Sequence, residues 1–146
     1  MTVADRIRLA PTPADVSRFN AWFDEKCIRA GIAKTLAADL KLCVNEVLAN
    51  AISYGFREIA KPWITVRIQL DKTRAIATII DNGTYFDLRG WRVQKDRDLM
   101  AGEPGRFGIA LVKERAKRLD YSRFCKRNHL RITCELPAPC TAGPHT

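Results

Sequence analysis

One segment, residues 40–54, constrains the fold most, because it combines a wide apolar helical face with a polar stripe along its edge. In a helix, residues three and four apart lie on the same side. Seven apolar residues then share one face: Leu40, Cys43, Val44, Val47, Leu48, Ala51 and Ile52. Glu46, Asn50 and Tyr54 recur every four residues along the neighbouring stripe. We therefore expect a buried helix with a carboxylate, a carboxamide and a phenol along one edge.

The polar stripe has a chemical interpretation and a plainer one. A carboxylate and a carboxamide one turn apart can act on the same ligand, because an Asn oxygen suits Mg²⁺ and a Glu can accept a proton or hold a water. The same spacing is also common on solvated helix surfaces. Glu46 and Asn50 alone therefore leave both interpretations open.

Length and composition predict one domain with a real core. The chain has 146 residues, of which 47% are hydrophobic. We expect the domain to cover residues 1–136 and a loose tail to cover residues 137–146, where proline and glycine recur. The sequence shows no signal-peptide pattern and no apolar run of about 20 residues, so we expect a soluble, cytoplasmic protein without membrane contact.

The formal net charge of +9 is concentrated in one segment. Residues 88–131 contain thirteen basic and five acidic residues, which gives this segment a net charge of +8. Such a segment attracts an anionic partner, whether a nucleotide, a nucleic acid or an acidic protein surface. The charge alone does not distinguish among the three.

The apolar periodicity predicts helices and strands along most of the chain. Thr12 as N-cap and Pro13 at the first helical position predict a helix that runs to Ala30 and stops at Gly31. The other expected elements are a strand at 6–9, a helix at 34–54, strands at 63–70 and 75–80 around a turn at 71–73, a helix at 109–119, and a hairpin of 120–126 and 129–136 turning at Arg127-Asn128.

Two glycine-containing motifs follow the buried strand. Asp81-Asn82-Gly83 comes directly after it, an arrangement that either aims a carboxylate into a pocket or makes an ordinary turn. Gly105-Arg106-Phe107-Gly108 opens onto a helix, where free backbone N–H groups and the helix dipole can bind an anion. Between the motifs, residues 88–107 lack apolar periodicity, which is typical of a lid or a mobile loop.

The order and spacing of these three motifs resemble the GHKL ATPase superfamily, which includes gyrase, MutL and histidine-kinase ATP domains. In particular, the chain is similar to the small bacterial anti-sigma-factor serine/threonine kinases over about residues 6–136. The resemblance implies an α/β (α+β) two-layer sandwich of the Bergerat type, in which helices cover one face of a mixed, mostly antiparallel sheet. ATP would lie between the helices and the lid.

The resemblance also implies a role for each motif residue. Glu46 would be the general base that takes the proton from a serine or threonine hydroxyl of a partner protein. Asn50 would ligate the Mg²⁺ that bridges the phosphates, Asp81 would accept the adenine amine, and Gly83 would let the backbone approach the base. The remaining cofactor-binding positions would be Gly105, Arg106 and Gly108 at the phosphates and Thr133 beside the adenine.

The sequence departs from the family pattern at three positions. Arg106 stands where relatives often carry glycine, so it would either clamp a phosphate or crowd the loop. Tyr85 occupies the place of a second glycine in the wider superfamily, and Lys117 that of an acid. These departures affect the partner-facing surface more than the nucleotide site.

Three functions follow as hypotheses. The first is an anti-sigma factor and ATP-dependent serine/threonine kinase that uses Mg²⁺, forms a homodimer, phosphorylates an anti-sigma-factor antagonist and makes no direct contact with nucleic acid. The second is a catalytically silent ATP-binding switch that regulates a sigma factor or a phosphatase. The third is a basic nucleic-acid-binding protein, suggested by the charge of residues 88–131 but supported by no recognised motif.

Overall fold

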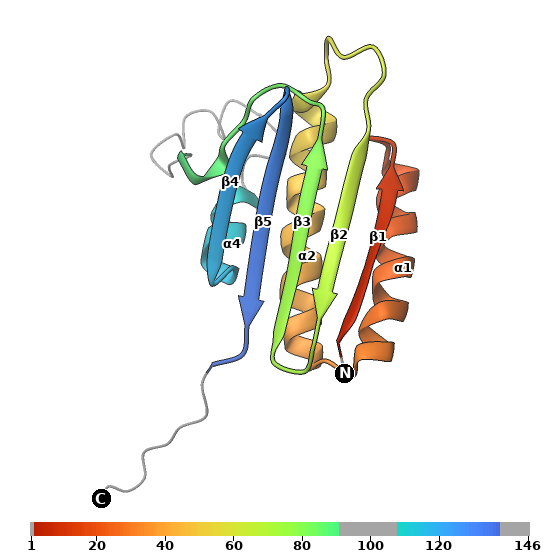
Figure 1. Ribbon diagram of the computed structural model, residues 1–146, viewed down its shortest axis with the longest axis vertical. Coiled ribbons are helices and arrows are strands. Elements are labelled where there is room, and N and C mark those ends of the chain that lie inside the picture. The colour runs from red at the N-terminus through yellow and green to blue at the C-terminus, as the bar shows by residue number, and fades with distance from the viewer. Residues whose placement is uncertain (1, 91–107, 138–146) are drawn as a thin grey trace, which may run out of the picture.

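The protein folds into a sheet and a layer of helices that covers one face of that sheet (Figure 1). The computed structural model describes residues 2–90 and 108–137. In this part of the chain the strands are β1 (Val3–Leu9), β2 (Ile64–Leu70), β3 (Arg74–Asp81), β4 (Arg118–Phe124) and β5 (Arg127–Glu135). The helices are α1 (Pro13–Ala30), α2 (Lys34–Asn50) and α4 (Gly108–Arg115), with a π-helix η1 (Ala51–Gly55) and a 3-10 turn η2 (Leu88–Gly90). This arrangement confirms the predicted α+β two-layer fold.

The strands form one sheet in the order β1-β2-β3-β5-β4, and each pairing between described strands is antiparallel. Directly opposite residues of antiparallel strands share a face of the sheet. Val66, Ile79 and Leu130 are such partners across β2, β3 and β5, and all three are buried. The register therefore gives the sheet an apolar inner face under the helices, while no described helix covers its other face.

Helix α1 begins and ends as the sequence predicts. The Thr12 hydroxyl accepts a hydrogen bond from the Asp15 backbone N–H at 3.2 Å, and Pro13 is the first helical residue. Gly31 ends the helix in the left-handed conformation with φ of 65°, which costs glycine no Cβ clash. Of the described helices, none has the length and apolar character that a bilayer span requires.

The predicted single helix over residues 34–54 is divided in the structure. It is α-helical from Lys34 to Asn50 and then widens into the π-helix η1. A π-helical turn of this kind is rare and often marks a functional site. The carbonyl of Gly55, at the end of η1, accepts hydrogen bonds from the backbone N–H of Thr84 at 2.9 Å and from its hydroxyl. These bonds tie η1 to the loop that follows β3.

The core lies between the inner face of the sheet and helices α1 and α2. Its largest fully buried side chains include Phe19, Phe23, Leu40, Leu48, Ile64, Ile68, Ile79 and Ile132. The rings of Phe19 and Phe23 stack with their centroids 5.5 Å apart. Because α2 packs its apolar face into this core, its polar stripe is held at a fixed place beside the sheet.

Two predictions near the C-terminus are wrong in their boundaries. The helix ends at Arg115 rather than at residue 119, because Lys117 N–H bonds to Thr133 O at 2.8 Å and Leu119 pairs with Ile132 in the sheet. The last hairpin turns at Cys125 and Lys126, which have φ of 52° and 59°, and not at residues 127–128. Positive φ at both central residues is the geometry of a two-residue turn between twisted strands.

We predict that Leu40→Ala lowers the free energy of unfolding by about 2–5 kcal/mol, because Leu40 is fully buried and the substitution leaves a cavity. Ile28 on α1 is 81% exposed, and Ile28→Ala should change this free energy by less than about 0.5 kcal/mol. Urea denaturation followed by circular dichroism measures both. Equal effects in the two variants would contradict the described packing of α2.

Candidate functional site

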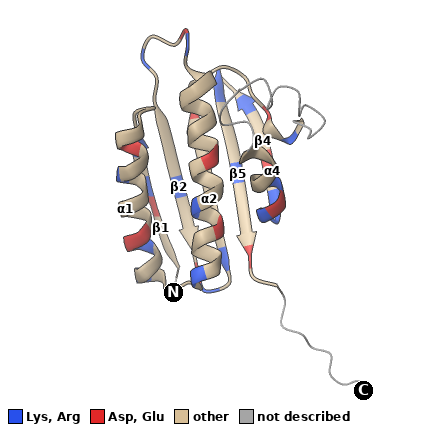
Figure 2. Cartoon of the chain, turned by 180° about the vertical axis from the view of Figure 1, so that it is seen from behind, with Lys and Arg blue, Asp and Glu red and all other residues tan. Residues whose placement is uncertain are grey.

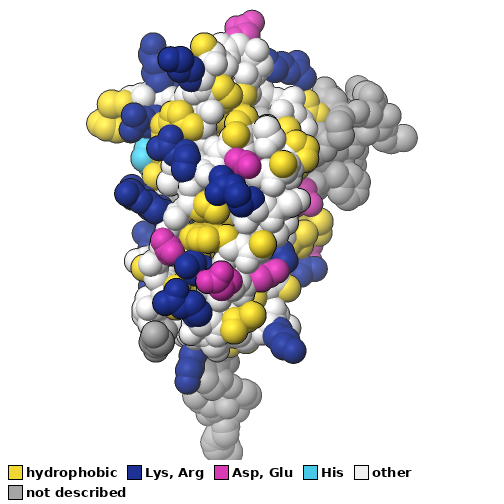
Figure 3. All heavy atoms as spheres, turned by 90° about the vertical axis from the view of Figure 1, so that its right-hand side faces the viewer, with side chains coloured by type: hydrophobic (Ala, Val, Ile, Leu, Met, Phe, Trp, Pro, Cys, Tyr) yellow, Lys and Arg dark blue, Asp and Glu magenta, His cyan; other side chains and the backbone are white. Residues whose placement is uncertain are grey.

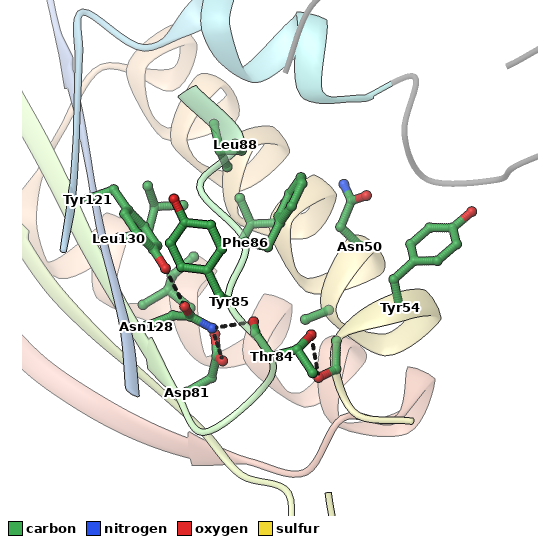
Figure 4. Close-up of a pocket in the computed structure, with 14 residues that line it drawn as sticks. Asn50, Tyr54, Asp81, Thr84, Tyr85, Phe86, Leu88, Tyr121, Asn128 and Leu130 are labelled. Carbon is green, nitrogen blue, oxygen red and sulfur yellow. Dashed lines mark hydrogen bonds between the residues drawn. The ribbon is translucent and has the colours of Figure 1, made fainter. Parts of the chain in front are cut away.

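A cavity of about 160 Å³ lies between α2 and η1 on one side and β3, β5 and the loop after β3 on the other (Figure 4). Its apolar lining includes Val47, Ala51, Ile79 and Leu130, and its polar lining includes Asn50, Tyr54, Asp81, Tyr121 and Asn128. A cavity of about this volume can hold one aromatic ring. Apolar walls with a few polar groups are typical of sites for small molecules.

Asp81 ends β3 at the base of this cavity, as the sequence predicts. Its Oδ1 accepts two hydrogen bonds, from Gly83 N–H at 2.8 Å and from Asn128 Nδ2 at 3.0 Å. Within the described residues, no hydrogen bond reaches its Oδ2. One carboxylate oxygen therefore fixes the side chain, and the other can accept a hydrogen bond from a ligand.

Burial raises the pKa of Asp81 above its ordinary value of 3.8. The hydrogen bonds from Asn128 and Gly83 act in the opposite direction, as do the nearby charges of Arg123 and His129. Loss of hydration is the largest of these effects. The carboxylate consequently takes up a proton more readily than an exposed aspartate does.

Asn128 is the site residue that sequence analysis missed. It is 7% exposed, donates to Asp81 Oδ1 and to Thr84 O at 2.9 Å, and accepts from the Tyr121 hydroxyl and from Arg123 Nη1 at 2.8 Å. Its side chain therefore connects β3, β4, β5 and the loop after β3. An Asn beside a short loop is typical of a turn, which led to the misplaced hairpin. The alternation with Leu130, Ile132 and Cys134 was the signal that placed residue 128 on the inner face.

Glu46, Asn50 and Gly108 lie together at the side of the cavity nearest to α4. Asn50 lines the cavity, and its Nδ2 donates to the backbone carbonyl of Glu46 at 3.0 Å. Gly108 is the first residue of α4, and an added Cβ there would lie 1.8 Å from Glu46 Oε2. No larger residue fits at position 108 without moving the carboxylate. The N-terminus of α4, which favours a negative charge, thus contacts the side chain of Glu46 directly.

Gly83 is required by the packing of the protein itself. A Cβ at this position would lie 2.8 Å from Gly55 O and 2.9 Å from Asp81 Oδ1. The absence of a side chain lets the loop after β3 reach η1 and lets Gly83 N–H bond to Asp81. Gly83 O also accepts a hydrogen bond from Arg123 Nη1 at 3.1 Å.

One other predicted site residue, Thr133, is not brought to the cavity. Thr133 lies on β5 opposite Ile76, on the face of the sheet away from the helices, because side chains alternate along the strand and Ile132 and Cys134 point inward. Gly105 and Arg106 lie outside the described residues, as does the rest of the predicted lid between residues 91 and 107. Among the described residues, no cluster of three or more His, Cys, Asp and Glu side chains could hold a metal ion.

The chain matches one protein-family model and several curated kinases. The model of the family described as "Histidine kinase-like ATPase domain" matches residues 9–134. The serine/threonine-protein kinase BtrW of Bordetella bronchiseptica is 25% identical over 130 residues, which cover 88% of this chain and 92% of the relative. The serine-protein kinase RsbW of Listeria innocua is 28% identical over 121 residues, which cover 77% of this chain and 76% of the relative.

Solved structures support the same fold. The histidine kinase domain of the blue-light activated histidine kinase EL346 of Erythrobacter litoralis matches with a TM-score of 0.52 and 20% identity over 84% of this chain. The full EL346 kinase matches with a TM-score of 0.52 and 21% identity. This chain spans 60% and 34% of those two structures, so the likeness concerns one domain of each. The match over residues 9–134 shows that the chain belongs to the family of histidine kinase-like ATPase domains, within the superfamily that its motifs resemble.

Proposed function

We propose that this protein is an ATP-dependent serine/threonine protein kinase that also binds a sigma factor and phosphorylates an anti-sigma-factor antagonist. One observation carries the proposal: an apolar cavity has the half-bonded carboxylate of Asp81 at its base and Asn50, one turn from Glu46, on its wall. The names of the relatives BtrW and RsbW support the kinase activity.

The cavity has the properties that an adenine ring requires. Its walls are apolar, and its volume of about 160 Å³ suits one heterocycle rather than a whole nucleotide. Asp81 Oδ2 can accept a hydrogen bond from the exocyclic amine of adenine. Asn128 holds Asp81 in place for this contact, so the donors and acceptors of the site are fixed before the ligand binds.

Asn50 and Glu46 have the oxygen atoms that Mg²⁺ prefers, but they are too few to hold the ion alone. In nucleotide sites, Mg²⁺ takes its other ligands from phosphate oxygens and water. The ion supplies charge neutralisation at the phosphates when it is bound. The hydrogen bond from Asn50 Nδ2 to Glu46 O orients the carboxamide for this role.

Glu46 is the residue that we assign as general base. Its side chain is half-buried against Gly108, at the edge of the cavity where a phosphate chain leading from an adenine ring would reach α4. There its carboxylate can accept the proton of a serine or threonine hydroxyl of the antagonist as that oxygen bonds to the γ-phosphorus of ATP, while the bond from this phosphorus to ADP breaks and ADP leaves. Gly105 and Arg106 keep their proposed role at the phosphates.

The proposal includes cellular context. We infer a cytoplasmic homodimer whose partners are the sigma factor and the antagonist, without direct binding to nucleic acid. The second function, a catalytically silent ATP-binding switch, has the same nucleotide site but includes no phosphate transfer by way of Glu46.

We predict that Glu46→Gln lowers the rate of phosphate transfer by roughly 10²–10⁴-fold, because Gln keeps the size of the side chain but cannot accept the proton. ATP affinity should stay within about threefold of wild type. Transfer of labelled γ-phosphate to purified anti-sigma-factor antagonists measures the rate. ATP binding by wild type without transfer to any of these antagonists would favour the silent switch.

We predict that Asn50→Ala weakens Mg-ATP binding by at least about tenfold, with a smaller effect when Mg²⁺ is chelated. Asn45 offers a matched control on the same helix, because its amide bonds to Asn20 and lies outside the cavity. Asn45→Ala should leave affinity unchanged. Calorimetry with and without Mg²⁺ measures both, and equal losses would remove Asn50 from the metal site.

We predict that Asp81→Asn weakens ATP binding by roughly 10–100-fold, because one charge-assisted hydrogen bond to the adenine amine is lost. Inosine triphosphate, which carries a carbonyl in place of that amine, should bind wild type about as weakly as ATP binds the variant. The variant should discriminate little between the two nucleotides. Strong preference for ATP in Asp81→Asn would contradict the assigned contact.

The raised pKa of Asp81 gives ATP binding a pH dependence of known sign. Only the ionised carboxylate accepts the hydrogen bond, so affinity should fall as the pH drops through the raised pKa, above the ordinary value of 3.8. Asp81→Asn should abolish this dependence. Calorimetry at a series of pH values, with the fold checked by circular dichroism, provides the measurement.

A further inference from the structure

The face of the sheet opposite the helices carries a dense group of arginines. In Figure 1 the described helices all lie behind the sheet, and the face toward the viewer is uncovered. Alternation along the strands places seven exposed arginines of the described residues on it: Arg6, Arg8, Arg67, Arg74, Arg118, Arg127 and Arg131. The acids on the same face are Asp120 and Glu135. We name these seven residues the arginine face.

Most of the arginine face has no acidic ion-pair partner among the described residues. Arg118 pairs with Asp120 at 3.0 Å, and Glu135 pairs with Lys117 at 3.5 Å. The other six arginines form no ion pair with any described residue. By contrast, acidic and basic positions are interspersed over the helices, as Figure 2 shows. The two layers of the molecule therefore differ in charge.

Two of the arginines even oppose each other. Arg6 of β1 and Arg67 of β2 are direct partners in the register, and like charges in this position destabilise a sheet. The same row continues through Thr78 to Arg131 of β5 and ends at Asp120 of β4, directly opposite Arg131. The Arg6–Arg67 pair has no acid directly opposite it in the register, so an anion supplied from outside the chain would relieve this repulsion.

The row borders a shallow hollow of about 400 Å³ in the arginine face. Arg6, Arg67 and Arg131 line it, together with Ile76 and Thr78. Asp5 also lines it, and its carboxylate is paired with Lys26 of α1. Figure 3 views the molecule from the β1 side, and dark blue side chains gather along the edge that belongs to this face. The hollow thus combines three guanidinium groups with an apolar side chain.

We propose that the arginine face is the docking surface for an acidic, amphipathic segment of a partner protein. Guanidinium groups bind carboxylates through paired hydrogen bonds, and residues one helical turn apart have Cβ atoms about 5–6 Å apart. Neighbouring strands are about 4.8 Å apart, so Arg6 and Arg67 match that spacing. Apolar residues beside the carboxylates would contact Ile76 in the hollow.

Other occupants fit this face less well. A second copy of the chain would place arginine against arginine. Single-stranded nucleic acid needs a series of aromatic rings for its bases to stack on. On this face Trp63 is covered by Arg8 and Arg127, whose guanidinium carbons lie 4.3 and 5.3 Å from its ring centroid, and Phe124 at the end of β4 is the single exposed ring among the described residues of the face. The inference is independent of the proposed kinase activity, because the arginine face lies across the sheet from the Asp81 cavity.

The test uses the full-length protein and a fluorescent synthetic helix with glutamates one turn apart beside leucines. Fluorescence anisotropy at physiological salt should show saturable binding, and a peptide with Gln in place of Glu should not bind. Arg67→Gln with Arg131→Gln should weaken binding by at least about tenfold. The matched control, Arg29→Gln with Lys34→Gln, removes two exposed charges from the helical layer and should change affinity by less than about threefold.

A charge-preserving variant and a stability measurement separate docking from folding. Arg67→Lys with Arg131→Lys should bind at an intermediate level, because lysine keeps the charge and loses the paired hydrogen bonds. The Tm of the Gln double variant should stay close to that of wild type, because Arg67→Gln removes the repulsion with Arg6 while Arg131→Gln removes the favourable charge opposite Asp120.

Four results would overturn the proposal. The first is no saturable binding at millimolar peptide, and the second is an equal loss of affinity in the two Gln double variants. The third is a single-stranded DNA oligonucleotide that binds as tightly as the peptide and loses the same affinity in Arg67→Gln with Arg131→Gln. The fourth is a wild-type dimer in sedimentation that this same variant dissociates. The third result would assign the face to nucleic acid, and the fourth to a second copy of the chain.

Discussion

The hydrogen bond between Asn128 and Asp81 is the interaction on which the site depends. It joins β3 to β5 at the point where both strands reach the cavity, and it leaves one oxygen of Asp81 for a ligand. The loop after β3 then depends on the same Asn128 through Thr84 O, and η1 depends on that loop through Gly55 O. A single buried amide therefore sets the position of one wall of the cavity relative to the other.

Sequence patterns predicted most of the fold because its main determinants are local. Thr12 and Gly31 bound α1 through contacts within a few residues, and the alternation in β2 and β3 follows from burial on one face. The π-helix at η1 was not predicted, because its hydrogen bonds to Thr84 join residues that are far apart in the chain. The turn at Cys125 and Lys126 was missed because neither is a residue type that favours positive φ.

The sequence predicted part of the candidate site, namely the residues whose positions depend on local structure. Glu46, Asn50, Asp81 and Gly83 could be named as candidates because of their spacing on a helix or their place directly after a strand, and the structure places them at or beside the cavity. Asn128 required knowledge of the register between β3 and β5, which only the folded sheet supplies. Thr133 was expected beside the adenine from the family resemblance, but the alternation along β5 places it on the face of the sheet away from the cavity. The proposed roles of Glu46, Asn50 and Asp81 are supported by the geometry of the cavity. The proposed roles of Gly105 and Arg106 are supported by the family resemblance alone.

The contact between Gly108 and Glu46 has a mechanical consequence. Because Gly108 has no Cβ, the backbone at the first turn of α4 lies in direct contact with the carboxylate of Glu46. A shift of the first turn of α4 toward α2 would therefore displace the carboxylate directly, through one van der Waals contact and without an intervening residue.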